Sequence, residues 1–411
     1  MEGGGEARLD LADLGLAQGA DVLLKHALVP LAPGARLAIF GREPSLAPHL
    51  VEWARARGHR FAAAEARDVL GAPAAASGAR LVGWLERGTA ATARWVGALQ
   101  AGQTESDVAE CAPPEWGLAA RGATVEAGVP PFFFPLHDKD LVWADNLAHM
   151  YRQAAAAQWN PETAIPWQQA VEAPEVVEDA LVQVLTYLIE NETAALVIPA
   201  RFASQVHPHY REAQQLLALQ AADEARHIEV FTRRAFAFRP RLGLSTVGGQ
   251  ASLRTLIEEP DFELASLLLS VLGEGSFVNL LWFLHKFGPD ACTRDMMKLA
   301  AQDEARHVAF GVAHLARHVQ KDRKQLDRLA GAIRQRHAVL EHTAGLNEEV
   351  FEGLVILAAG SLEPAAIARG HAEVQTLSQQ MNQGRIQRLE VLGFDRKAAE
   401  ALSELHTRNF M

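Results

Sequence analysis

The pentapeptide Asp-Glu-Ala-Arg-His occurs twice in the chain, at residues 223–227 and 303–307. Each copy places a glutamate three residues before a histidine, and on an α-helix this spacing puts both side chains on one face. The pairs are Glu224 with His227 and Glu304 with His307. Carboxylate oxygens and imidazole nitrogens are ligands for divalent transition metals, so each copy can supply half of a metal site.

An apolar segment precedes each copy and carries an acid on the stripe that a helix would bury. In the second segment this acid is Glu274, which lies on the row Leu267, Val271, Val278 and Leu281. In the first segment Glu192 continues the apolar row, whereas Glu190 continues a polar row. We therefore expect Glu192 to be the inward acid, although Glu190 also fits the spacing of an antiparallel hairpin.

A buried acid is costly without a counter-charge, and the repeat supplies the means to bind one. Four carboxylates and two neutral imidazoles around two divalent ions balance four negative charges with four positive ones. A single copy of the pentapeptide is typical of a solvated helix face. Two copies, each preceded by an acid-bearing apolar helix, favour a dinuclear metal centre.

The order Glu, Glu-x-x-His, Glu, Glu-x-x-His over residues 176–320 resembles the di-iron carboxylate branch of the ferritin-like superfamily, on its oxygenase and oxidase side. The resemblance implies a four-helix bundle that holds two iron ions, with manganese or a mixed pair as alternatives. The ligands that it implies are Glu192, Glu224, His227, Glu274, Glu304 and His307. It also implies that Asp223 and Asp303 accept the free ring N–H of the ligating histidines, and that Arg226 and Arg306 pair with these aspartates.

Departures from subfamily patterns narrow the expected chemistry. Phe231 stands where a ribonucleotide reductase small subunit has its radical tyrosine, which disfavours a tyrosyl radical. Ala300 stands where the arylamine N-oxygenases have a seventh ligand, a histidine. Cys111 and Cys292 are the only cysteines, too few for the four-cysteine iron module of rubrerythrins or for a disulfide framework.

The sequence pattern around these residues predicts a mainly α protein. We expect a ferritin-like four-helix bundle with extra helices, preceded by a small α/β sandwich. We expect the α/β domain at residues 1–100, a linker at 101–138 and the helical di-metal domain at 139–411. The first domain reads as strands near residues 9–11, 37–40, 60–64 and 80–85, with helices at 20–31 and 45–58.

The N-terminal stretch at residues 15–34 resembles the TusA/SirA sulfur-carrier family over about 75 residues. That family carries sulfur on a Cys-Pro pair at the start of its first helix, and here Gln18 and Gly19 occupy the place. Without a thiol there is no persulfide, so the resemblance implies a docking or packing domain rather than a sulfur carrier.

Composition sets the outer limits. Fifty acidic residues against 39 basic ones give a net charge of −11, which argues against a nucleic-acid partner. The start of the chain lacks the features of a secretion signal, and we expect a cytoplasmic protein that is not bound to a membrane. Residues 264–284 imitate a membrane span, but the central Glu274 indicates a helix buried in protein. We expect Trp159 and Trp167 to pack in the core, and His207 and His209 to lie away from the metals.

These observations favour an oxidoreductase, a di-iron oxygenase or oxidase that uses dioxygen to hydroxylate, N-oxygenate or dehydrogenate a small or carrier-bound organic substrate. The alternative is an iron-handling or peroxide-scavenging protein of ferritin or rubrerythrin type. Further expectations are an electron-donor or docking protein at the N-terminal domain and a homodimeric assembly.

Overall fold

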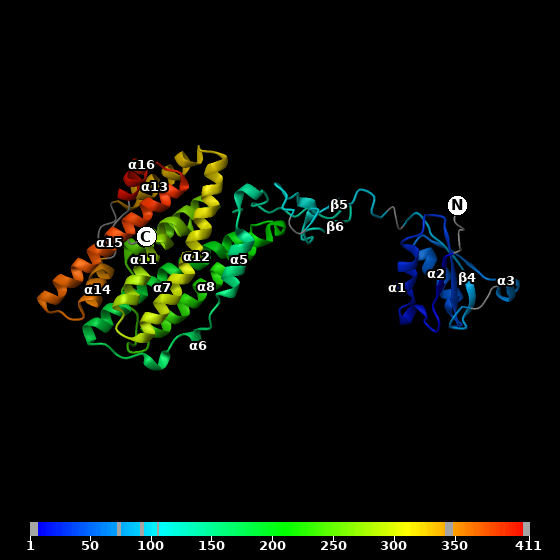
Figure 1. Ribbon diagram of the computed structural model, residues 1–411, viewed down its shortest axis with the longest axis horizontal. Coiled ribbons are helices and arrows are strands. Elements are labelled where there is room, and N and C mark those ends of the chain that lie inside the picture. The colour runs from blue at the N-terminus through cyan, green and yellow to red at the C-terminus, as the bar shows by residue number, and fades with distance from the viewer. Residues whose placement is uncertain (1–6, 72–74, 91–93, 105–106, 342–347, 406–411) are drawn as a thin grey trace. The chain divides into compact units, whose positions relative to one another are not determined.

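The computed structural model describes residues 7–71, 75–90, 94–104, 107–341 and 348–405. It divides into two compact units: residues 1–100 with 123–130, and residues 101–122 with 131–411. The first unit is a small α/β fold and the second is helical (Figure 1). The stretch 101–138, expected as a linker, is therefore shared between the units.

The α/β unit has a four-stranded sheet in the order β1-β2-β4-β3. Its strands are β1 (Ala7–Asp10), β2 (Arg36–Gly41), β3 (Arg60–Ala63) and β4 (Arg80–Glu86). Strand β2 pairs parallel with β1 and antiparallel with β4, which pairs antiparallel with β3. Two further short strands, β5 (Leu99–Gln100) and β6 (Thr124–Val125), form a separate ladder.

Helices α1 (Ala20–Leu28) and α2 (Leu46–Ala56) cover one face of this sheet, because their apolar rows meet the alternate apolar residues of the strands. The buried contacts include Leu24 and Leu50 from the helices with Ile39 and Leu85 from the sheet. A short helix, α3 (Ala66–Gly71), follows β3. Gln18 and Gly19 lie directly before α1.

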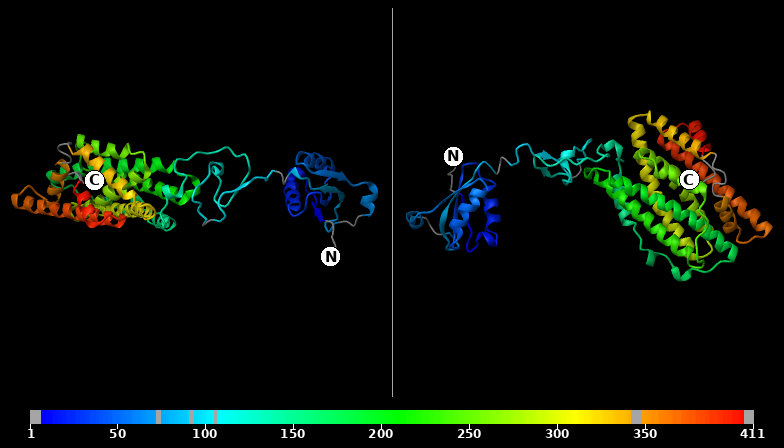
Figure 2. Two further views of the ribbon diagram at one scale, coloured as in Figure 1. Left: turned by 90° about the horizontal axis from the view of Figure 1, so that it is seen from above. Right: turned by 180° about the vertical axis from the view of Figure 1, so that it is seen from behind.

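The helical unit is built around two long helix pairs. Helix α7 (Glu175–Ala203) packs on α8 (Arg211–Ala235), and the apolar helix formed by α10 (Phe262–Ser266), η6 (Leu267–Glu274) and α11 (Gly275–Phe287) packs on α12 (Ala291–Lys321). Figures 1 and 2 show these helices running alongside one another. The chain order and side-by-side packing give the ferritin-like four-helix bundle that the sequence predicts.

Further helices surround the bundle. They are α5 (Leu147–Ala156), α6 (Pro161–Ala164), α9 (Val247–Ile257), α13 (Gln325–Leu340), α14 (Glu348–Ala359), α15 (Pro364–Leu392) and α16 (Arg396–Glu404). Single turns of 3-10 helix occur at Leu16–Gln18, Pro114–Trp116, Lys139–Leu141, Trp167–Gln169 and Pro208–Tyr210. Helix α5 packs on α8 and α12, α14 packs on α7, and α15 packs on α11.

A buried charge cluster ties three bundle helices together at one end. Arg234 of α8 bonds Glu178 of α7 and also Asp290, which caps the start of α12. All three side chains are at most 4% exposed. Since an unpaired charge at such a depth would be expensive, this cluster fixes how the ends of the helices meet.

The segments 101–122 and 131–138 are attached to the turn between α7 and α8. Arg121 pairs with Glu212 at 2.7 Å, and the Tyr210 hydroxyl donates to the carbonyl oxygens of Glu110 and His137. These contacts explain why most of the expected linker belongs to the helical unit.

In the part of the chain that the structure describes, two single helices have the length and composition of membrane-crossing helices, Glu175–Ala203 and Phe262–Phe287. Within their most apolar windows, 67% and 83% of the residues are buried inside the protein. The second helix differs from the expected uniform α-helix, because Leu267–Glu274 is π-helical. Its last turn is closed by the N–H of Gly275, which donates to the carbonyl of Ser270, five residues earlier.

Candidate metal centre

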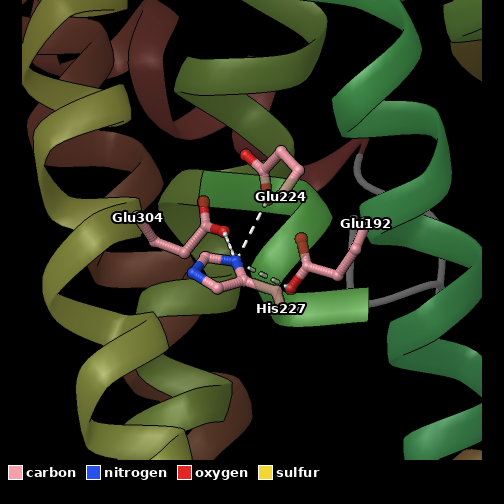
Figure 3. Close-up of side chains that lie close together, drawn as sticks. All are labelled: Glu192, Glu224, His227 and Glu304. Carbon is pink, nitrogen blue, oxygen red and sulfur yellow. Dashed lines mark hydrogen bonds and ion pairs between the residues drawn. The ribbon is translucent and has the colours of Figure 1, made fainter. Parts of the chain in front are cut away.

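Six inward-facing side chains from the four bundle helices form two adjoining groups. One group is Glu192, Glu224, His227 and Glu304, and the other is Glu224, Glu274, Glu304 and His307. Within each group the candidate ligand atoms lie within 4.8 Å of one another, and every member is at most 4% exposed. Figure 3 shows the first group, with His227 between three carboxylates.

Glu224 and Glu304 belong to both groups, so the geometry is that of two neighbouring cation positions with shared carboxylates. Glu224 reaches both imidazoles, with Oε2 at 3.1 Å from Nδ1 of His227 and Oε1 at 3.0 Å from Nδ1 of His307. Glu304 does the same at 3.5 Å on each side. Glu192 and Glu274 each join one group and close its outer side.

The helix repeat explains why these atoms converge. In α8 and α12 the three-residue spacing sets each Glu and His on the face that meets the opposite helix pair. In η6 the extra residue per turn ends at Glu274, so the π-helical stretch sets the direction of that carboxylate. The structure places Glu192 inside the cluster, whereas Glu190 is outside both groups.

The donor set fits metal ions. The buried atoms that make no hydrogen bond include Oε1 of Glu192, Oε1 of Glu224, Oε2 of Glu274 and both carboxylate oxygens of Glu304. Buried polar atoms without hydrogen bonds are rare and costly, and here they gather at one point between four helices. Two divalent cations would satisfy them and balance the four carboxylates.

The outer nitrogen of each imidazole is held by an aspartate from the other repeat. Nε2 of His227 lies 3.1 Å from Oδ2 of Asp303, and Nε2 of His307 lies 3.1 Å from Oδ2 of Asp223. An aspartate that accepts the Nε2–H leaves Nδ1 free to bind a metal. The repeats are therefore crossed, since each supplies the aspartate that orients the histidine of the other.

Arginines neutralise these aspartates. Arg226 pairs with Asp223 and lies 3.5 Å from Asp303, and Arg306 pairs with Asp303. The pKa of Asp223 is lowered, because its bonds to His307, Gln158 and Arg226 outweigh the effect of burial.

Three residues for which the sequence analysis expected no role at the metals take part in this network. The indole Nε1–H of Trp159 donates to Oδ2 of Asp303 at 2.7 Å, and its ring stacks on His227. Gln158 donates to Oδ1 of Asp223 at 2.8 Å. Gln220 donates to Oε1 of Glu274 at 2.8 Å, which leaves Oε2 of that carboxylate for a metal.

Trp159 thus does more than fill the core, while Trp167 donates to a backbone carbonyl and stacks under an arginine. A sequence signal for Gln220 was present, since it stands one helical turn before Glu224. His207 and His209 belong to neither metal group and are held at the turn by backbone bonds. Phe231 is fully buried beside His227, and Ala300 is also buried.

Without metal, the groups in the centre titrate as neighbours that must share protons. Burial, together with the charges of Glu224 and Glu304, raises the pKa of Glu192 well above its usual range, and burial with Glu304 does the same for Glu274. Burial opposes the charged imidazoles, but carboxylates on all sides raise the pKa values of His227 and His307 well above 6.5. In the metal-free centre these carboxyl and imidazole groups therefore tend to hold protons.

No protein-family model matches the chain, and no curated protein matches it. Among solved structures, a variant of an R2-like ligand-binding oxidase with an aerobically reconstituted Fe/Fe cofactor is similar at a TM-score of 0.49 and 16% identity, over 62% of this chain and 95% of that one. The same type of oxidase with an aerobically reconstituted Mn/Fe cofactor is similar at a TM-score of 0.47 and 15% identity, over 62% of this chain and 94% of that one.

Proposed function

We propose that the protein is a di-iron oxidase or oxygenase that uses dioxygen to oxidise a small or carrier-bound organic substrate. The observation that carries this proposal is the sharing of Glu224 and Glu304 by two adjoining groups, because two metal ions bound by these groups would be neighbours. Hard carboxylate oxygens with imidazoles suit iron, manganese or a mixed pair. Two adjacent reduced irons supply two electrons together to dioxygen.

The protein's own contribution is positioning and exclusion of water. Each group would hold a cation through four residues, three carboxylates and one imidazole. Gln220 holds one oxygen of Glu274, and Asp303 and Asp223 hold the two imidazoles, so the ligand directions are fixed before metal enters. Phe231 and the ring of Trp159 give the His227 side an apolar wall.

Anaerobic loading with ferrous iron followed by mixing with dioxygen tests the proposal. We expect two irons per chain, and dioxygen uptake at an electrode that is faster than with the same iron in free buffer. Glu192→Ala should abolish the fast uptake, and Glu190→Ala is the matched control because this acid stands two residues away and outside both groups.

Three results would count against the proposal. Uptake no faster than in buffer would remove the oxidase activity. Deposition of many irons per chain in a hollow multimer would instead favour an iron-storage protein of ferritin type. Equal loss of activity in both variants would mean that the effect is unrelated to metal binding.

We propose that the protein works in the cytoplasm as a homodimer, and that the TusA-like α/β unit, without a sulfur-carrying cysteine, is a docking platform for an electron donor or carrier. Pull-down of a donor by the full chain, compared with a chain that starts at residue 101, tests the docking role.

A further inference from the structure

Two arginines of α15 lie against the helix that carries Glu274. Arg385 is 6% exposed and donates to two hydroxyl oxygens, those of Ser403 and Ser276. Arg388 donates from Nε to the carbonyl of Val271 at 2.6 Å, and its Nη2 is buried with no hydrogen-bond partner. Within residues 7–71, 75–90, 94–104, 107–341 and 348–405, no carboxylate forms an ion pair with either guanidinium.

A positive charge held away from water without an acid partner in the described chain carries a cost in free energy. Burial lowers the pKa of Arg388 to about 10, and burial with the neighbouring Arg388 charge lowers that of Arg385 to about 10. Guanidinium groups at such depth are normally balanced by a carboxylate or a phosphate. Arg234 in the same unit shows the ordinary arrangement, since it has two acid partners.

Two glycines make room for the Arg388 guanidinium. A Cβ at position 275 would lie 2.3 Å from Nε of Arg388, and a Cβ at position 384 would lie 3.0 Å from its Nη1. Any side chain at Gly275 would therefore displace the guanidinium. With Nε fixed on Val271 and Nη2 buried beside Gly275, Nη1, next to Gly384, is the nitrogen left to donate to an oxyanion.

Arg388 also lines a groove of about 410 Å³ between α11 and α15. The lining residues are Asn279, Gln380, Gln383, Gly384, Gln387, Arg388 and Val391. The three glutamines follow one stripe of α15, and no acid lines the groove. Carboxamides both donate and accept hydrogen bonds, so this lining suits a polar ligand rather than a hydrocarbon chain.

We propose that this groove binds a small polar oxyanion, a carboxylate or a phosphate, with Arg388 as its charged partner. The site is separate from the metal centre, because Arg388 reaches the backbone of η6 and the Cα side of Gly275 rather than the metal-ligating groups. The amide stripe would bind the neutral polar part of the same molecule.

Calorimetric titration of the metal-loaded full chain with malonate and, separately, with inorganic phosphate tests the proposal at constant ionic strength. We expect saturable binding of at least one of these anions, and the tighter of the two identifies the class. Arg388→Gln should weaken binding by about tenfold or more, since a charge-assisted bond is lost. Arg369→Gln, on the exposed side of the same helix, is the matched control and should bind as the wild type does.

A second measurement on the unaltered protein covers the case in which Arg388→Gln fails to fold. The arginine-selective reagent phenylglyoxal should modify Arg388 more slowly when the bound anion is present, as read by peptide mass spectrometry. No saturable binding of either anion, undiminished binding in folded Arg388→Gln, or an unchanged modification rate at Arg388 would each overturn the proposal. Binding of malonate to the metals alone would give the last two results.

Discussion

Metal loading of the centre should release protons, and the number follows from the structure. In the metal-free protein the imidazoles of His227 and His307 have pKa values raised well above 6.5, so both are charged at neutral pH. A metal must bind the neutral ring, which expels one proton from each histidine. Glu192 and Glu274, whose pKa values are also raised, add up to two more.

The magnitude is large enough to measure. For each proton released, the free energy of metal binding becomes more favourable by about 1.4 kcal/mol when the pH rises by one unit. Two protons therefore give about 2.7 kcal/mol, a factor of about 100 in affinity per pH unit. The window is from about pH 6 to 7.5, where free histidine titrates but the buried pair stays charged without metal.

The free energy of unfolding of the metal-free protein should fall as the pH rises, whereas the affinity for metal should rise. Groups with raised pKa values stabilise the fold when protonated, and this stabilisation is lost as pH rises from the unfolded values of 6.5 for histidine and 4.5 for glutamate toward the folded ones. The lowered pKa values of Glu224 and Asp223 act in the acid range, below their unfolded values of 4.5 and 3.8. The gain in thermal stability on metal addition should therefore grow with pH.

The assay is calorimetric titration with Mn²⁺, which avoids oxidation, in buffers of different ionisation enthalpy at about pH 7. The dependence of the measured heat on buffer gives the proton number directly. His149→Ala, an exposed histidine on α5, is the control and should leave that number unchanged. Release of fewer than one proton per loaded centre, or metal affinity that is flat over the window, would refute the reasoning.

Three further substitutions probe the supports of the centre. Asp303→Asn should weaken metal binding by roughly 10- to 100-fold, because the charged acceptor for His227 is lost, and wild-type affinity in a metal titration would contradict this. Trp159→Phe keeps an aromatic ring but removes the bond to Asp303, so the same titration should show a smaller loss, about fivefold. Arg234→Leu leaves two buried carboxylates unpaired and should lower the free energy of unfolding in urea by about 3–5 kcal/mol, whereas Arg233→Leu, near the surface, should cost about 1 kcal/mol or less.

The fold was predictable where a local pattern repeats. The strands expected near residues 37–40 and 80–85 are β2 and β4, and the helices predicted around the two pentapeptides are α8 and α12. Alternation of apolar residues and the three-or-four spacing report burial directly, so these elements are visible in one sequence. The inward position of Glu274 followed from the same rule.

The parts that sequence reasoning missed depend on contacts between distant segments. Trp159 lies 144 residues before Asp303, and nothing in its neighbourhood marks its indole as a donor to that carboxylate. The π-helical stretch Leu267–Glu274 has an ordinary apolar composition, so periodicity reads it as α-helix. The half-buried Arg388 falls on a helix of polar composition, which gives no sign that its Nε bonds the backbone of the neighbouring helix.

The crossed pairing of histidines and aspartates bears on how the centre can form. His227 is oriented by Asp303, which is on the helix of the second repeat, and His307 is oriented by Asp223, which is on the helix of the first. In a helix pair from one repeat alone, the imidazole would lack the aspartate that accepts its Nε2–H. The carboxylate that is shared by the two groups would then have only one metal position to serve. Neither half can therefore be a working mononuclear site, and the two metal positions must be assembled together when the helix pairs dock. This interdependence accounts for identical pentapeptides in two halves whose other sequences differ.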